Sequence, residues 1–188
     1  MDNAKQKSIS ALVVAHNEET QLAECLKGLS FADQLVVVLD KCTDDSKLIA
    51  SSFTEHLIEG NWDLEGDRRN VGIQACDSDW ILEVDSDERV STLLADEIKE
   101  AIKHTEAGYF LIPFDNYIGE TRVRYGWGAS WGVSAAPRLF RKGYKRWGSQ
   151  RIHPSLELKG PRKELENRMV HFVDKNISDM IQRLDRYT

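Results

Sequence analysis

Short apolar runs separated by polar turns dominate the first part of the chain. The segments 9–15 and 35–39 are apolar, rich in β-branched side chains and followed at once by polar residues, which predicts two buried strands. Between them the leucines of 22–29 recur at helical spacing, with Asn17 as a candidate N-cap, and the turn at 43–46 can begin another short helix. A strand, a helix and a second strand in this order indicate parallel pairing of the strands.

The same alternation continues along the chain. We predict a strand at 56–59, a helix over about 67–75, a strand at 80–84 and a further helix that begins after Ser91, whose hydroxyl can cap it. Residues 9–104 are therefore expected to form an alternating α/β unit.

The pattern changes after Gly108. Apolar segments at 109–113, 121–125 and 138–140 are separated by glycines and tryptophans, which predicts antiparallel or mixed strands and loops. The last periodic segment, 177–187, has a helix pattern that reaches the final residue without a stop signal, so a truncated end is an open alternative.

Composition narrows the class of protein. The 188 residues include 41% hydrophobic side chains, enough for one compact domain, and the longest apolar runs reach only about five residues, too few to span a bilayer. The polar start Met1-Asp2-Asn3 is not followed by an apolar stretch typical of a signal sequence, so we expect a cytoplasmic protein. The three cysteines show no ligand-like spacing, which fits a reducing compartment and a packing role.

Charge is distributed unevenly. Residues 122–168 carry twelve Lys or Arg against three Glu, about +9, and the net charge of −6 leaves about −15 for the rest of the chain. A basic segment on an acidic protein can face an anionic partner such as a membrane surface, or it can be a solvated β-ribbon. Both interpretations stay open, and no nucleic-acid partner is expected.

Polar groups follow three of the four predicted parallel strands, where ligands bind in open α/β sheets. These groups are His16-Asn17-Glu18, Asp40 and Asp85-Ser86-Asp87. The carboxylates of Asp85 and Asp87, one residue apart at a strand end, can turn toward one hard cation such as Mg²⁺ or Mn²⁺. An Asp-x-Asp in an acidic chain can also be simple strand-end solvation.

The ordered motifs resemble family 2 glycosyltransferases of the GT-A fold. They are Val14-Ala15-His16-Asn17-Glu18-Glu19, Val38-Leu39-Asp40 followed by Thr43-Asp44-Asp45-Ser46, Arg69-Asn70-Val71-Gly72, and the run from Trp80 to Arg89. The most similar branch is the lipopolysaccharide-core β-1,4-glucosyltransferase-like enzymes, and the resemblance is strong over about residues 8–105. It implies a Rossmann-like, mostly parallel sheet flanked by helices, with residues 1–107 as the nucleotide-sugar-binding half and 108–188 as a mixed or antiparallel acceptor side.

The resemblance also implies roles for single residues. The nucleotide-sugar-binding set would be Val14, His16, Glu18, Asp40, Arg69, Asp85 and Ser86. Asp40 would accept a hydrogen bond from the base, and Arg69 would hold the pyrophosphate, unless it is a surface ion pair. Asp85 would contact the ribose and, through water, a Mn²⁺ or Mg²⁺ ion that Asp87 binds directly. The ion would stabilise the departing diphosphate.

The general base is assigned from the chain after the fourth predicted strand. Enzymes of this family are generally inverting and need a base for the acceptor hydroxyl, which relatives commonly supply from a His-Glu pair. Here Pro154 follows His153 in place of that glutamate, so Glu157 is the candidate base and Asp115 the alternative, although either can be structural. His153 can complete the metal shell or hydrogen-bond in the core, and the core role is the simpler interpretation for both His153 and His171.

The resulting hypothesis is a transferase that moves a sugar from a nucleotide-diphosphate sugar, UDP-sugar above all. The acceptor would be a lipopolysaccharide, a lipid-linked glycan or another glycan, with possible peripheral membrane contact through residues 122–168. A nucleotidyltransferase would need a Gly-rich basic loop after the first strand, whereas that loop is acidic here. A degenerate homologue that binds nucleotide without turnover remains an alternative because of Pro154. The tryptophans Trp127, Trp131 and Trp147 can form a sugar or lipid platform or simply pack.

Overall fold

The computed structural model describes residues 7–124, 134–151 and 154–174, and these form a mixed α/β fold. In the first half the elements are β1 (Ile9–Ala15), α1 (Leu22–Lys27), β2 (Gln34–Asp40), α2 (Ser46–Ser51), β3 (Leu57–Gly60), α3 (Glu65–Ala75), β4 (Trp80–Asp85), β5 (Glu88–Arg89) and α4 (Thr92–Ala101). The second half adds β6 (Tyr109–Ile118), β7 (Thr121–Arg122), β8 (Ala135–Arg141), β9 (Lys145–Trp147), β10 (Leu156–Leu158), β11 (Arg162–Glu164) and β12 (Met169–Asp174).

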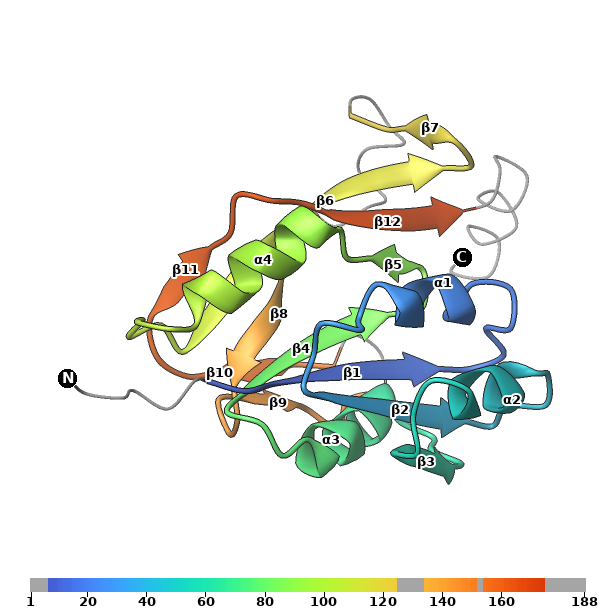
Figure 1. Ribbon diagram of the computed structural model, residues 1–188. Helices are drawn as coiled ribbons and strands as arrows, with labels where there is room; N and C mark the ends of the chain where they lie inside the picture. Colours follow the sequence, from blue (N-terminus) through green and yellow to red (C-terminus); the bar gives the residue numbers. More distant parts are fainter. Residues whose placement is uncertain (1–6, 125–133, 152–153, 175–188) are drawn as a thin grey trace.

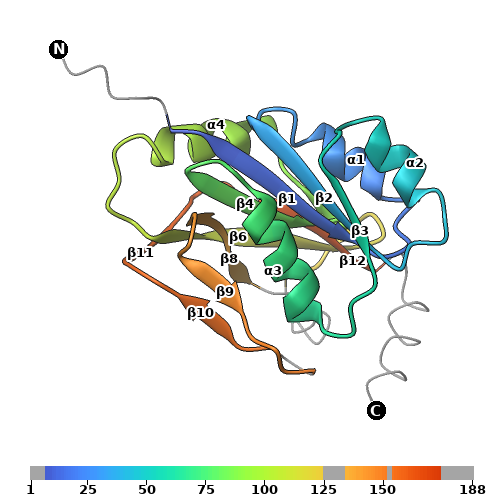
Figure 2. The same ribbon diagram turned by 90° about the horizontal axis from the view of Figure 1, so that it is seen from below.

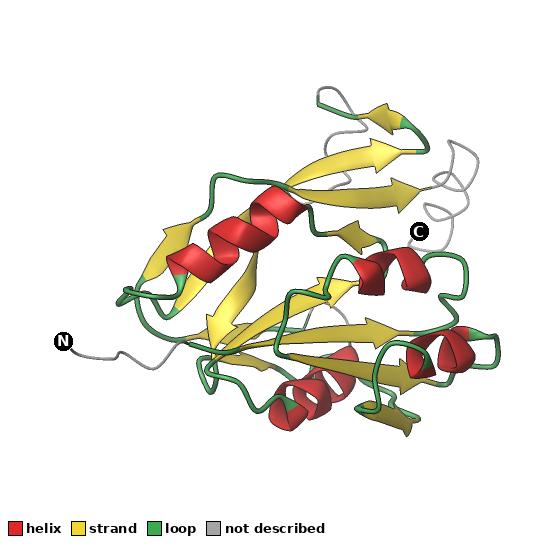
Figure 3. Ribbon diagram, viewed as in Figure 1, coloured by secondary structure: helices red, strands yellow, loops and turns green. Residues whose placement is uncertain are grey.

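The parallel half of the sheet is built as the apolar pattern predicts. Strands β3, β2, β1 and β4 lie side by side in this order and are all parallel. Successive side chains of β1 enter two different cores, because they point to opposite faces. Leu12 packs with Ile73 of α3, whereas Val13 packs with Leu26 of α1 and Leu94 of α4. Helices α1, α2 and α4 therefore lie on one side of these strands and α3 on the other (Figures 1 and 3).

The second half continues the same sheet with strands of mixed direction, which confirms the antiparallel or mixed strands predicted after Gly108. Strand β8 is antiparallel to β4 and β6, and β12 is parallel to β6. The short strand β5, directly after the Asp85-Ser86-Asp87 turn, pairs with β12. Residues of 1–107 and 108–188 thus share one sheet, and their division into donor and acceptor halves stays a prediction. The predicted helix at 177–187 lies outside the described residues.

A separate hairpin, β9–β10, packs beside α3 rather than joining the main sheet (Figure 2). Its three-residue strands are too short to give a clear alternation in the sequence, so the pattern did not predict them.

One predicted cap is correct and one is wrong. Ser91 caps α4, since its Oγ accepts the N–H of Leu94 at 3.2 Å. Asn17 does not cap α1, which begins only at Leu22 after Gln21 and has no side-chain cap. Asn17 instead adopts a left-handed conformation (φ 55°), and its Oδ1 accepts the N–H of Thr43 at 2.8 Å. The side chain therefore ties the loop after β1 to the loop after β2.

The cysteines behave as packing residues. All three are free thiols, and Cys25 and Cys76 are buried. Burial raises the pKa of the Cys76 thiol to about 12 and raises that of Cys25 as well, so neither is a reactive thiolate. Across the described ranges, none of the helices combines the length and apolar character that crossing a membrane requires.

Candidate active site

The loops after β1 and β2 meet at the carboxyl edge of the parallel strands. His16 Nδ1 lies 2.6 Å from the carbonyl oxygen of Asp40, and the N–H of Glu18 donates to Ser46 Oγ at 2.8 Å. His16 is exposed, while Val14 and Glu18 are partly buried. The predicted base and ribose residues thus come from one connected edge of the sheet, and their contacts with a nucleotide stay predictions.

Asp40 lies at the tip of β2, where it is only 5% exposed. Its Oδ2 forms an ion pair with Arg68 Nη1 at 2.9 Å, and its Oδ1 accepts the N–H of Trp62 at 3.0 Å. The Nε of Arg68 is buried and has no hydrogen-bond partner among the described residues. Arg68 was not among the predicted site residues, although it directly precedes the motif that begins with Arg69.

Arg69 points inward from α3 rather than toward open solvent. Its guanidinium contacts Glu65 at 2.9 Å, Glu83 at 2.6 Å and Asp85 at 2.9 Å, and it lies over the ring of Trp147 at 5.0 Å. The alternative interpretation, a surface ion pair, is therefore wrong, because the side chain is only 11% exposed. Contact between Arg69 and a pyrophosphate stays a prediction.

Glu83 is the centre of this buried charge network. It is fully buried in β4, where Lys145 Nζ lies 2.7 Å from its Oε2 and the Trp147 indole N–H donates to the same oxygen at 3.3 Å. Burial alone would raise the pKa of Glu83, but the charges of Lys145 and Arg69 outweigh it and lower the pKa to about 2. Glu83 is therefore ionised at neutral pH.

Asp85 is held by two arginines. Arg138 of β8 bonds to Asp85 Oδ2 and to Glu88 Oε1, while Arg69 takes the other oxygen of Asp85. The backbone N–H of Asp85 also donates to Glu88 Oε2 at 2.9 Å. Despite burial, the two guanidinium groups keep the pKa of Asp85 well below its usual range. Both oxygens of Asp85 are thus occupied by protein partners.

Asp87 has a different environment. Its Oδ1 is buried without a hydrogen-bond partner among the described residues, and its Oδ2 lies 3.5 Å from Nε2 of His171 on β12. Burial alone would lower the pKa of His171, but its hydrogen bond to Asp87 raises it. Burial, together with the nearby charge of Asp87, raises the pKa of Glu18, which is hydrogen-bonded to Ser86.

These contacts decide which groups fit a divalent cation. The unpartnered carboxylate oxygen of Asp87 is a suitable donor, and the nearby His171 Nε2 becomes one only after it loses its proton, whereas Asp85 is already engaged. The described residues contain no cluster of three or more His, Cys, Asp or Glu arranged to hold a metal by themselves. Mg²⁺ is usually held by one or two carboxylates plus substrate phosphates, so this donor set fits an ion that binds together with a nucleotide. The Nδ1 of His171 lies 2.9 Å from Asn116 Oδ1, which agrees with the simpler interpretation of a hydrogen-bonded core residue.

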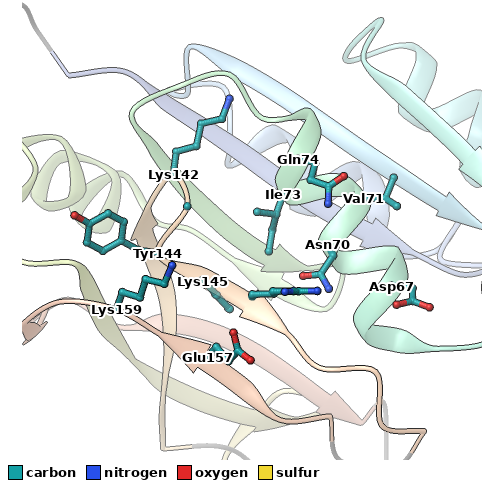
Figure 4. Close-up of a pocket in the computed structure, with 12 residues that line it drawn as sticks. Asp67, Asn70, Val71, Ile73, Gln74, Lys142, Tyr144, Lys145, Glu157 and Lys159 are labelled. Carbon is teal, nitrogen blue, oxygen red and sulfur yellow. The ribbon is translucent and has the colours of Figure 1, made fainter.

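The two candidate bases lie elsewhere. Glu157 is exposed on β10, opposite Arg146 of β9, and lines a pocket between α3 and the β9–β10 hairpin (Figure 4). Asp115 is paired with Arg122 and lies 3.6 Å from Arg168. His153, Trp127 and Trp131 lie outside the described residues, whereas Trp147 packs against α3 and Glu83.

Comparison with known proteins agrees with this geometry. The model of "Glycosyl transferase family 2" matches residues 10–157. An uncharacterized glycosyltransferase of Rickettsia conorii is 29% identical over 100 residues, which cover 53% of this chain and 36% of that protein. The lipopolysaccharide core biosynthesis glycosyltransferase LpsC of Rhizobium meliloti is 22% identical over 169 residues, 81% of this chain and 58% of LpsC. The chain thus spans between about a third and three fifths of the length of these relatives.

Solved structures share the fold. The crystal structure of S. aureus TarS 1-349 superposes with a TM-score of 0.65 at 16% identity, covering 88% of this chain and 60% of that one. TarS 1-349 in complex with UDP-GlcNAc gives a TM-score of 0.58 at 20% identity, covering 73% of this chain and 46% of that one. These likenesses support the GT-A fold. Because the family model matches most of the chain, the protein belongs to glycosyl transferase family 2.

Proposed function

We propose that the chain transfers a sugar from a UDP-sugar to a glycan or lipid-linked acceptor, with inversion, and that it depends on Mn²⁺ or Mg²⁺. The observation that carries the proposal is the carboxyl edge of the sheet, where Asp40 and Arg68 lie at the end of β2 and Asp87 and His171 lie beyond the end of β4. A TarS structure of the same fold holds UDP-GlcNAc, which supports a nucleotide sugar as donor.

The pairing of Asp40 with Arg68 suits uracil. The edge of uracil presents one N–H donor between two carbonyl acceptors, and a carboxylate beside a guanidinium presents the complementary acceptor and donors. Arg68 keeps an unpartnered buried Nε and is 25% exposed, so it can contact a base after a small movement. The base would then replace part of the Asp40–Arg68 contact.

The end of β4 would hold the diphosphate. Asp87 and His171 would bind the cation, which when bound neutralises charge on the departing diphosphate. Arg138 and Arg69 keep Asp85 fixed and ionised, so its position beside Asp87 is set before the nucleotide arrives. Glu18 and Ser86 would contact the ribose side of the same site.

Titration calorimetry of UDP with and without Mn²⁺ tests the donor site. We expect UDP to bind clearly more tightly with Mn²⁺ than in excess chelator, and more tightly than ADP, because the base contacts are matched to uracil. Arg68→Ala should weaken UDP binding about tenfold through the loss of a charge-assisted hydrogen bond, while leaving the Mn²⁺ dependence in place. Equal affinity in excess chelator would contradict the metal role.

The identity of the base is tested separately. If Glu157 is the general base, Glu157→Gln lowers transfer by about 10²- to 10⁴-fold and leaves UDP affinity unchanged. Glu164→Gln, an exposed glutamate on β11, is the matched control. Near-normal transfer by Glu157→Gln would leave Asp115 as the remaining candidate. A parent protein that binds UDP but transfers to no acceptor would favour the degenerate alternative.

Membrane contact through residues 122–168 is part of the proposal. The positive charge that this segment exposes on the surface is smaller than its residue count suggests. Arg138 and Lys145 point inward and neutralise buried carboxylates, so they add nothing to the surface. We expect the protein to co-sediment with anionic vesicles at low salt and to be released at high salt. Equal binding to neutral vesicles, or no binding at all, would remove this part of the proposal.

A further inference from the structure

The pocket between α3 and the β9–β10 hairpin has a volume of about 670 Å³, within the range of small-ligand sites (Figure 4). Asp67 and Asn70 of α3 line one end, and Lys142, Tyr144 and Lys159 line the other. None of these five side chains belongs to the contacts that we assign to the UDP-sugar. The pocket is therefore distinct from the donor contacts, although the candidate base Glu157 also lines it.

Tyr144 is held in a fixed position at its end of the pocket. A Cβ atom added to Gly108 would lie 2.9 Å from Cδ1 of the ring, and one added to Gly160 would lie 3.2 Å from Cε1. The ring edge therefore rests on two glycines, where a larger residue would crowd it. The N–H of Lys159 donates to the Tyr144 carbonyl at 2.9 Å, and the residue remains 37% exposed. A fixed, partly exposed aromatic ring suits the apolar face of a sugar ring.

Charged side chains also line this end of the pocket. Lys159 lies beside Tyr144 in Figure 4, whereas the ammonium of Lys142 points away from the ring, and both lysines are exposed. Lys159 and Arg146 form no ion pair with any described residue, and the Lys142 ammonium lies 3.5 Å from Asp77, a long contact. Glu157 lies across the hairpin from Arg146 and is equally unpaired within the described ranges. Lys159 and Arg146 thus leave positive charge without a carboxylate partner near an aromatic ring, which fits an acidic ligand.

We propose that this pocket binds a saccharide unit that carries an acidic group. The sugar ring packs on Tyr144, its carboxylate or phosphate pairs with Lys159, and Glu157 accepts hydrogen bonds from hydroxyls. The inference rests on the proposed function, under which the bound unit belongs to the acceptor glycan and not to the donor. The pocket would then select acceptors by this acidic unit.

Calorimetry with digalacturonate, in excess chelator and without nucleotide, tests the pocket independently of the donor site. We expect digalacturonate to bind and maltose, its uncharged counterpart, to bind at least about tenfold more weakly, because it lacks the charge-assisted contacts. Lys159→Glu should weaken digalacturonate binding at least about tenfold. Tyr144→Ala should abolish it and Tyr144→Phe should retain it, because the ring and not the hydroxyl is the platform. Lys163→Glu, which reverses an exposed charge on β11, is the control and should bind normally.

Each alternative outcome is decisive. Equal binding of maltose would overturn the recognition of an acid, and competition by inorganic phosphate as strong as by digalacturonate would reduce the pocket to a simple anion site. If Tyr144→Ala does not fold, unchanged binding by Lys159→Glu still overturns the proposal. A protein that binds UDP but not digalacturonate would remove this inference and leave the proposed function standing. Binding of digalacturonate without binding of UDP would remove the proposed donor site and leave the pocket as a site for an acidic saccharide.

Discussion

Asp87→Ala is expected to lower sugar transfer by about 10³-fold or more, because a cation at the diphosphate supplies several kcal/mol of stabilisation and each 1.36 kcal/mol is a factor of ten. The variant should also bind UDP with the same affinity in Mn²⁺ and in excess chelator. The fold should persist, since the Asp87 side chain is 32% exposed and its removal relieves the repulsion that raises the pKa of Glu18. Transfer assays and calorimetry on the same preparation measure both effects.

The matched control for this variant is Asp63→Ala. Asp63 lies in the loop after β3, its side chain is 97% exposed, and its ion pair with Lys41 is 3.4 Å long. The Asp63→Ala substitution removes the same charge as Asp87→Ala but leaves the contacts of Asp87 unchanged. Transfer should therefore stay within about twofold of the parent, as expected for an exposed pair. An Asp87→Ala protein that keeps Mn²⁺-dependent UDP binding would contradict the assignment of Asp87 as the metal ligand.

The parallel half of the fold was predictable because its strands are buried on both faces. Strands such as β1 and β4 appear in the sequence as short continuous apolar runs, and the alternation with helices dictates their parallel pairing. The β9–β10 hairpin and the two-residue strand β5 carry too few residues for any periodicity to register. Their positions depend on tertiary contacts, with α3 for the hairpin and with β12 for β5.

The candidate site was predictable to the extent that topology alone determines it. Asp40 and the Asp85-Ser86-Asp87 turn had to reach one edge, because they follow parallel strands of one sheet, β2 and β4, which flank β1. Arg138 and His171 arrive from distant strands of the second half, and no local pattern distinguishes them from other polar residues. The sequence predicted that Arg69 contacts either a pyrophosphate or a partner on the surface. It did not identify Glu83 and Asp85 as the partners of Arg69. Glu83 lies within an apolar strand, and a charge there was the one signal that pointed to a buried network.

Glu83→Gln should destabilise the fold by about 3–5 kcal/mol, because it leaves Lys145 and one contact of Arg69 buried without their carboxylate partner. The control is Glu59→Gln on β3, which removes an exposed pair with Lys47 and should cost no more than about 1 kcal/mol. Urea unfolding measures both. Adding Lys145→Met to Glu83→Gln should recover part of the loss, since the unpaired ammonium is then gone. A loss below about 1 kcal/mol in Glu83→Gln would contradict the network.

The same residue sets an acid dependence whose sign follows from its lowered pKa. The Glu83 pKa falls from its usual 4.5 to about 2 in the folded state, so its stabilisation is complete above pH 4.5 and is lost as pH falls toward 2. At 1.36 kcal/mol per pKa unit, the contribution at neutral pH is about 3 kcal/mol, close to the loss expected from the substitution. The stability of Glu83→Gln should therefore change less between pH 5 and 2 than that of the parent. Parallel curves of unfolding free energy against pH for the two proteins would show that Lys145 and Arg69 do not stabilise the ionised carboxylate of Glu83. That result would contradict the buried network.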